Sequence, residues 1–365
     1  MPRLTLLVAA LAALLLAAAP AAGARKLPHG FYGVMTDGVL MTQGDEAFAR
    51  EFAVMRSTGV ETVRPVVYWA DMQPERGGPV MFGSLDRLMG EAARNGLDVI
   101  PVVLRAPSWA RVEPGNFASP PKDPADFAAF LTALIGRYGP DGSFWAEHPD
   151  LPRRPQRDWQ VWNEPNLDRY WSSPKPFAKD FVKLQRVAYA AIKQADPGAR
   201  VILAGFGNDS WNAFRAAYDA GLTGRMYDVA AAHPFTGKVK NVMKIVRFNR
   251  EVMRENGDGR KPMIVTEITW PAAKGTEATT TAGYEVTPKE QAVKLTDAYR
   301  AFIRNRKRFR LERVIWSTWL TTDCCSHNSF DWSGLRKIDP RKENAEPVDK
   351  PAFFAFRKLA LAAQR

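Results

Sequence analysis

Cysteine and histidine are scarce in this chain of 365 residues. Its two cysteines, Cys324 and Cys325, are adjacent, which excludes a scaffold held by several disulfides and a metal site built from cysteine alone. In an oxidising compartment the pair either closes on itself as a vicinal bridge or stays free, and we favour the bridge. The four histidines show neither His-x-His nor His-Glu-x-x-His spacing, so no catalytic metal is predicted.

Motifs that mark other enzyme classes are also missing. No Gly-x-Gly-x-x-Gly follows the first predicted strand, which argues against an open, doubly wound sheet that binds a dinucleotide. No Gly-x-Ser-x-Gly elbow presents a serine nucleophile. No low-complexity tract or extended linker divides the chain, as is typical of one large domain.

Long apolar runs are absent except at the N-terminus, where LTLLVAALAALLLAAA follows Arg3 and precedes the small residues PAAGA. This run is shorter than the roughly 20 residues that span a bilayer. We therefore interpret residues 1–24 as a secretory signal peptide that is cut after Ala24, with an uncleaved anchor as the alternative. The mature protein would be extracellular or periplasmic and would contain no membrane span.

The remaining composition is apolar and basic. Apolar residues make up 46% of the chain, enough for a large core, and the net charge is +12. The densest basic cluster, RNRKRFRLER at residues 304–313, is more typical of a solvated helix end than of a site for acidic polymer or membrane. No nucleic-acid partner is predicted, and the sequence does not define an oligomeric state.

Eight short apolar runs alternate with segments of helical length. The predicted strands are residues 31–35, 62–69, 98–104, 159–162, 200–205, 228–234, 262–270 and 313–320. The predicted helices include residues 45–57, 85–95, 124–138, 177–195 and 242–256. The strands are nearly unbroken apolar runs, as expected of parallel strands covered on both faces. We predict an α/β fold, a single-domain (β/α)8 TIM barrel over residues 25–365.

In such a barrel, functional side chains gather at the carboxyl ends of the strands. Polar and aromatic candidates occupy these ends: Arg64, Trp69, Asn163, Glu164, His233, Glu267, Trp270, Trp316 and Trp319. Neighbouring side chains of a regular strand point to opposite faces. Asn163 and Glu164 can therefore face one substrate only if the strand becomes irregular there, and Pro165 marks that place.

Two of these candidates, Glu164 and Glu267, approach the barrel axis from opposite sides. Hydrolysis of a glycosidic bond needs two carboxyl groups, one as acid and one as nucleophile or base. Tryptophan rings stack on the apolar faces of sugars, so the tryptophans are predicted to bind substrate. Arg64 lies in a barrel strand and needs a carboxylate partner, for which Glu267 is the natural candidate. Taken singly, each glutamate is more typical of a salt bridge or helix cap, while His233 also suits a turn and Trp316 suits core packing.

The chain resembles the retaining glycoside hydrolases of the (β/α)8-barrel clan A. The residues that carry the resemblance are WNEPN at the fourth strand and TEITW at the seventh, whose glutamate comes 103 residues after the first. The segment RYGPDGSFWAEHP…RDWQVWNEPN is most similar to family 39-like secreted bacterial enzymes, and family 5-like enzymes are also similar. The likeness covers essentially the whole chain after the signal.

The resemblance implies a role for each matching residue. Glu164 would be the general acid/base, with a raised pKa, and Glu267 the nucleophile that Arg64 orients and keeps ionised. Asn163 would hold the 2-hydroxyl of the reacting sugar, and His233 would lie near the nucleophile. The sugar floor would be Trp316 or Trp319, preferably the latter. No metal or organic cofactor would be required.

These expectations leave substrate and reaction partly open. The leading interpretation is a secreted retaining glycosidase that cleaves a poly- or oligosaccharide by double displacement. The alternatives are a transglycosylase that remodels envelope polysaccharide and a non-catalytic carbohydrate-binding barrel. Two intact glutamates argue against the last, because a binder has no need of both. Neither the sugar and linkage nor the choice between internal and terminal cleavage follows from the sequence.

Overall fold

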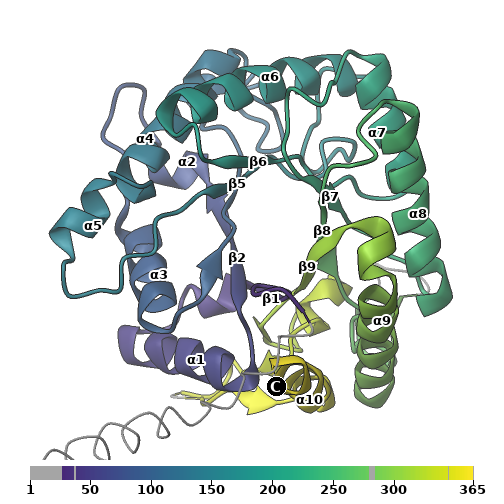
Figure 1. Ribbon diagram of the computed structural model, residues 1–365. Coiled ribbons are helices and arrows are strands. Elements are labelled where there is room, and N and C mark those ends of the chain that lie inside the picture. Colours follow the sequence, from purple (N-terminus) through teal and green to yellow (C-terminus); the bar gives the residue numbers. More distant parts are fainter. Residues whose placement is uncertain (1–26, 37, 279–283, 344, 365) are drawn as a thin grey trace, which may run out of the picture.

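The computed structural model describes residues 27–36, 38–278, 284–343 and 345–364. Parallel strands surround a central axis in these ranges, and helices form a ring outside them (Figure 1). The predicted (β/α)8 barrel is therefore confirmed. The predicted signal peptide, residues 1–24, lies outside the described residues.

All eight predicted strands are present, with shifted ends. They are β1 (Tyr32–Thr36), β2 (Thr62–Tyr68), β3 (Asp98–Val99) with β4 (Val102–Leu104), β5 (Asp158–Val161), β6 (Arg200–Ile202), β7 (Ala230–Ala232), β8 (Met263–Ile268) and β9 (Leu311–Trp316). The third predicted strand is divided between β3 and β4 at Pro101, which has no N–H to donate to a ladder. The order is β6-β5-β4-β2-β1-β9-β8-β7, and a parallel bridge between Ile202 and Val229 closes the ring.

The helices follow the strands as the alternating pattern predicts. They are α1 (Asp45–Thr58), α2 (Trp69–Met72), α3 (Gly83–Arg94), α4 (Pro124–Tyr138), α5 (Ser143–Glu147), α6 (Ala178–Ala195), α7 (Ser210–Asp219), α8 (Val239–Glu255), α9 (Pro288–Phe309) and α10 (Pro351–Gln364). A small sheet of β10 (Leu320–Thr321), β11 (Arg336–Lys337) and β12 (Val348–Asp349) lies beyond β9. None of the helices in the described ranges is both long and apolar enough to cross a bilayer.

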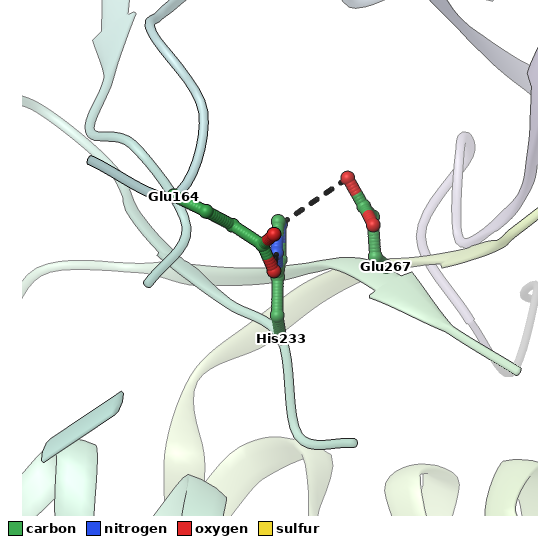
Figure 2. Close-up of side chains that lie close together, drawn as sticks. All are labelled: Glu164, His233 and Glu267. Atoms are coloured by element: carbon green, nitrogen blue, oxygen red, sulfur yellow. Dashed lines mark hydrogen bonds and ion pairs between the residues drawn. The ribbon is translucent and has the colours of Figure 1, made fainter. Parts of the chain in front are cut away.

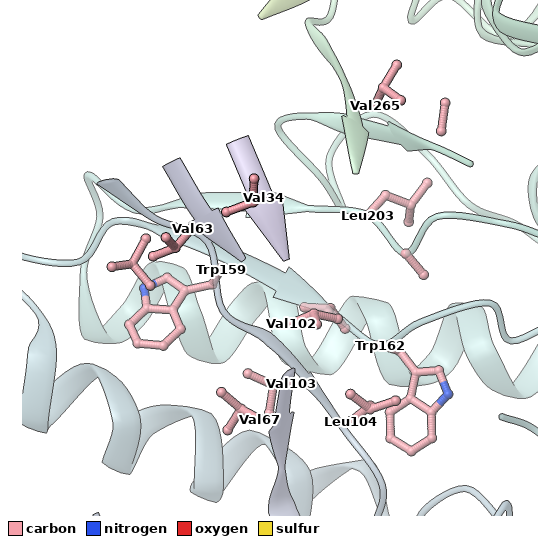
Figure 3. Close-up of a cluster of buried hydrophobic side chains, with 14 of the residues drawn as sticks. Val34, Val63, Val67, Val102, Val103, Leu104, Trp159, Trp162, Leu203 and Val265 are labelled. Atoms are coloured by element: carbon pink, nitrogen blue, oxygen red, sulfur yellow. The ribbon is translucent and has the colours of Figure 1, made fainter. Parts of the chain in front are cut away.

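The core is built from the branched side chains of the strands and the faces of the helices that cover them. Figure 3 shows part of it, with the labelled residues Val34, Val63, Val67, Val102, Val103, Leu104, Trp159, Trp162, Leu203 and Val265. All ten are at most 3% exposed. The barrel is therefore a rigid frame, because closely packed protein interiors resist displacement of their side chains.

The basic cluster at residues 304–313 spans the end of α9 and the start of β9. Lys307 and Arg308 are exposed in the last helical turn, where positive charge complements the helix dipole. Arg313 instead reaches inward, and its Nη1 lies 3.2 Å from Asp158 Oδ2. The predicted solvated helix end is therefore confirmed for the helical part of the cluster.

Candidate active site

Two glutamates and a histidine meet at the carboxyl ends of the strands. Glu164 follows β5, His233 follows β7 and Glu267 lies in β8. One carboxylate oxygen of each glutamate and a ring nitrogen of His233 lie within 4.8 Å of one another. Figure 2 shows the histidine contacting both acids: Nδ1 is 2.9 Å from Glu164 Oε1, and Nε2 is 3.7 Å from Glu267 Oε1. The fold thus brings together the two carboxyl groups that the sequence places on separate strands.

The backbone after β5 is irregular, as predicted. The strand ends at Val161, and both Trp162 (φ 64°) and Glu164 (φ 39°) adopt left-handed conformations. Such conformations cost about 1–3 kcal/mol each for residues other than glycine and persist only where the surrounding structure imposes them. The Glu164 N–H donates to the Gly205 carbonyl 2.9 Å away, which ties the turn to the neighbouring strand end. Asn163 and Glu164 can therefore both turn towards the site.

Arg64 connects three parts of the site from within the barrel. Its side chain is fully buried, and its Nη1 donates to Glu267 Oε1 at 3.0 Å, which confirms the predicted partner. Its Nη2 donates to Asn163 Oδ1 at 3.0 Å, and its Nε donates to Gln160 Oε1 at 2.7 Å. Because Asn163 accepts through its oxygen, its amide nitrogen is the end that can donate to a substrate hydroxyl. Gln160 was not among the predicted site residues, although a polar residue inside an apolar strand is a usable signal.

Glu164 is 2% exposed and bonded on both oxygens. Its Oε2 accepts from Arg169 Nη2 at 2.8 Å, while Oε1 contacts His233. Burial raises the pKa of the Glu164 carboxyl, but the hydrogen bond and charge of His233 and those of Arg169 outweigh burial and hold it below its usual range. The predicted raised pKa is therefore wrong for this structure. The main reason is His233, whose hydrogen bond and charge lower this pKa most, and Arg169 adds to the effect. Arg169 is a loop residue for whose pairing no local sequence signal exists.

Replacing Arg169 with glutamine is expected to move the alkaline limb of the kcat/KM pH profile to higher pH. A general acid must be protonated, so the rate falls as pH rises through its pKa. Arg169 lowers the pKa of Glu164, and removing its charge raises that pKa and extends activity upward in pH. The measurement is kcat/KM against pH on any glycoside that the wild-type protein cleaves.

The matched control for this change is Arg215→Gln. Arg215 lies on α7, is 45% exposed and pairs with Glu255, so its loss removes the same charge without touching Glu164. An Arg169→Gln profile that coincides with the control profile would show that Arg169 does not set the protonation of the acid.

Contacts with Glu164 and Thr266 fix the position of the His233 ring. It is 2% exposed, and its Nε2 lies 2.9 Å from the hydroxyl of Thr266, which leaves neither ring nitrogen for a sugar. His233 was also a candidate for substrate binding, but this geometry makes it a positioning residue, so that assignment is corrected. Gly205 makes this placement possible, because a Cβ at position 205 would collide with the His233 ring.

We expect Gly205→Ala to lower kcat by about 100-fold, because the added methyl group must displace His233 and with it Glu164. A misplacement of about 1 Å at a reacting group costs roughly that factor. The control is Gly136→Ala in α4, where a new Cβ meets no atom within 4 Å and should leave kcat unchanged. Equal kcat values for the two variants would contradict the positioning role of His233. Circular dichroism would verify that both variants fold.

A cavity of about 490 Å³ opens above these residues. The polar network contributes part of its lining through Arg64, Asn163, Arg169 and Glu267. Four aromatic side chains also line it: Tyr68, Tyr170, Phe235 and Phe330. Phe235 and Phe330 form an edge-to-face pair with centroids 5.6 Å apart. These rings supply the apolar surface on which a sugar ring can stack.

The tryptophans predicted to bind substrate lie elsewhere. Trp69, Trp270, Trp316 and Trp319 are 0% exposed, and none of them lines the cavity. Trp69 packs edge-on against Trp109 and stacks on Phe130. It follows Tyr68 at the end of β2, where neighbouring side chains take opposite sides, so the tyrosine reaches the cavity instead.

The other three tryptophans are core residues with satisfied indole N–H groups. Trp319 donates to Glu51 Oε2 at 2.7 Å, and Trp316 donates to the Ser333 carbonyl at 3.0 Å. Trp270 donates to a backbone carbonyl at 2.7 Å. Rings with no exposed surface cannot stack on a sugar, so the prediction of a tryptophan platform is wrong.

Cys324 and Cys325 are joined in a disulfide, as predicted. Both line the cavity, together with Asn328 and Asp331 from the same loop. The Cys325 N–H donates to Glu277 Oε1 at 3.2 Å, which ties this loop to the one after β8. The bridge is therefore part of the cavity rim.

Glu164, His233 and Glu267 are the one group within the described ranges that has enough ligand atoms in reach for a metal ion. Each carboxylate already pairs with an arginine, Glu164 with Arg169 and Glu267 with Arg64. Two adjacent guanidinium groups oppose the binding of a cation. The arrangement suits proton transfer and nucleophilic attack better than metal binding.

No protein-family model matches the sequence, and no curated protein is significantly similar to it. Solved structures do match. A family 39 glycoside hydrolase from Bacteroides cellulosilyticus WH2 is 20% identical, with a TM-score of 0.67 over 93% of this chain and 65% of that one. GH5_18 from Streptomyces cattleya, solved in complex with GlcNAc, is 16% identical, with a TM-score of 0.66 over 93% and 81%.

An exo-β-1,4-mannosidase from Opitutaceae bacterium strain TAV5 is 18% identical, with a TM-score of 0.61 over 92% of this chain and 60% of that one. This chain therefore spans less than two thirds of the length of the family 39 and mannosidase structures. The neighbours named here are glycoside hydrolases, and what this chain shares with them is the (β/α)8 barrel.

Proposed function

We propose that the protein is a retaining glycoside hydrolase that cleaves a poly- or oligosaccharide. The observation that carries this proposal is the separation of the two carboxyl groups, whose nearest oxygens lie within 4.8 Å of each other. Retaining enzymes place their carboxyl groups about 5–5.5 Å apart, whereas inverting enzymes leave about 6.5–9.5 Å for a water molecule. The aromatic lining of the cavity and the glycoside hydrolases that share the barrel support a carbohydrate substrate.

In the first step Glu267 attacks the anomeric carbon of the bound sugar. Its side chain is 13% exposed and lines the cavity, and Arg64 holds one of its oxygens. Glu164 donates its proton to the leaving oxygen as the glycosidic bond breaks. The amide nitrogen of Asn163 donates to a hydroxyl of the same sugar, and this bond can strengthen as charge develops at the ring.

In the second step water hydrolyses the glycosyl ester on Glu267. Glu164, now a carboxylate, takes the proton of the attacking water, and the released sugar keeps its anomeric configuration. Because His233 and Arg169 hold the pKa of Glu164 below its usual range, the carboxylate form that must accept this proton is the form present. The first step requires the protonated form, which places optimal activity on the acidic side of neutrality.

The test is a screen of the purified protein against polysaccharides, with product sizes read by mass spectrometry and anomeric configuration by NMR. Release of products with retained configuration is expected. Inverted products would overturn the two-step mechanism, and products longer than the substrate would indicate transglycosylation. Binding without any turnover would indicate a carbohydrate-binding barrel.

Secretion is a separate part of the proposal and rests on residues 1–24. N-terminal sequencing of the protein exported by a bacterial host should begin at Arg25. A mature chain that still begins at Met1 and sediments with membranes would indicate the uncleaved anchor.

A further inference from the structure

Arg105 and Arg111, on the loop after β4, are two adjacent cations without a carboxylate partner among the residues that the structure describes. Both guanidinium groups lie against one ring: Arg105 Cζ is 3.9 Å and Arg111 Cζ is 5.2 Å from the Phe117 centroid. Burial and the charge of Arg105 both lower the pKa of Arg111. Other partly buried arginines are neutralised, such as Arg137, which pairs with Asp86 and Glu147.

The hydrogen-bonding capacity of the Arg105 guanidinium group is also incompletely used. Its Nε is buried and has no hydrogen-bond acceptor among the described residues, and the Arg105 backbone adopts a left-handed conformation with φ 62°. A buried donor without a partner costs about 1–3 kcal/mol, and two like charges side by side add repulsion. Arg111 donates through Nε and Nη1 to the carbonyls of Ala106 and Pro114. An anion that docks against both guanidinium groups would relieve the repulsion between them.

The Arg105 side chain lies behind one wall of the cavity described above, and Arg111 lies beside it on the same loop. Arg105 Cζ is 5.1 Å from the ring centroid of Tyr68, which lines the cavity. On the next loop, Arg169 lines the cavity itself and lies 5.1 Å from the ring of Tyr170. The loops after β4 and β5 are neighbours, because those strands pair in the barrel. A hydrogen bond from the Ser172 N–H to the Ala118 carbonyl joins the two loops, so Arg105, Arg111 and Arg169 place three cations on adjoining loops beside the cavity.

We propose that Arg105, Arg111 and Arg169 bind the acidic groups, carboxylate or sulfate, of an anionic polysaccharide. Arginine suits either group, because its planar donors match two acceptor oxygens at once. The net charge of +12 would draw such a polymer to the protein from a distance. The direction of the chain rests on the proposed function: Arg169 contacts Glu164, which protonates the leaving oxygen, so the acidic sugars lie on the leaving-group side.

The test measures binding rather than turnover, so that its result does not depend on the proposed hydrolysis. In a Glu267→Gln background, calorimetric titrations at 0.15 M salt compare alginate oligosaccharides with their carboxyl-reduced forms, and dextran sulfate with dextran. Arg105→Gln, Arg111→Gln and Arg169→Gln together should weaken binding of the acidic ligand at least tenfold and leave the neutral counterpart unaffected. The acidic ligand that binds identifies carboxylate or sulfate as the recognised group.

The matched control removes three cations elsewhere. Arg304→Gln, Lys307→Gln and Arg308→Gln act on exposed residues at the C-terminal end of α9, on the opposite face of the barrel, and should change affinity less than twofold. Equal losses in the two triple variants would overturn the proposal in favour of general charge attraction. So would equal binding of acidic and neutral forms, or no binding of either acidic ligand. If the cavity triple variant fails to fold, Arg169→Gln alone, at a side chain 56% exposed, gives the same comparison.

Discussion

Replacing Glu267 with alanine is expected to lower kcat/KM by about 10⁴-fold or more, because it removes the group that bonds to the anomeric carbon. Azide should restore turnover, since a small anion fits the space that the side chain vacates and needs no base. It would attack from the face that Glu267 occupied, and the product would be a glycosyl azide of inverted configuration. Chromatography and NMR of the azide product provide the measurement.

In Glu267→Ala, the loss of the nucleophile must be distinguished from a loss of folding stability. Arg64 is fully buried, and loss of its carboxylate partner leaves a buried charge unpaired, which costs about 3–5 kcal/mol. Glu267→Gln keeps an acceptor for Arg64 and should retain more stability in urea unfolding while remaining inactive. Full activity in Glu267→Gln would rule out this residue as the nucleophile. Glu251→Gln, at an exposed side chain on α8, is the control for loss of a carboxylate.

Replacing Glu164 with alanine is expected to lower kcat on natural glycosides by about 10²–10⁴-fold, the usual contribution of a general acid. The size of the effect should depend on the leaving group. A dinitrophenyl leaving group needs no proton, so its release should remain fast and the glycosyl-enzyme should accumulate. Pre-steady-state kinetics would then show a burst of phenol, and the intact mass would increase by one glycosyl unit.

Azide distinguishes the roles of the two glutamates in this variant also. With Glu267 still present, azide intercepts the glycosyl-enzyme, and its product has retained configuration. An inverted azide product from Glu164→Ala would exchange the assigned roles. This variant should lose less stability than Glu267→Ala, because Arg169, the partner of Glu164, is 56% exposed and can turn to water.

Local patterns were sufficient for the barrel and for the pair of acids. A short apolar run in the sequence predicts each strand. The pairs Asn95-Gly96 and Asn256-Gly257 are typical helix ends, and α3 and α8 end one residue before them. In a parallel barrel all carboxyl ends of strands face one side, so chain order alone places Glu164 and Glu267 at the same mouth. The partner of Arg64 followed from the cost of burying a lone charge.

The aromatic lining and the protonation of Glu164 could not be derived in this way. Whether Tyr68 or Trp69 turns into the cavity depends on where β2 stops being regular, and an error of one residue exchanges core for cavity. The pKa of Glu164 depends on His233, at the end of β7, and on Arg169, which reaches it from an irregular loop. Strand order and burial follow from short-range periodicity, whereas the contacts of loop residues follow from packing between distant segments. The amino-acid pattern was therefore sufficient to predict the barrel and the positions of Glu164 and Glu267. The packing of the loops determines which other side chains line the cavity.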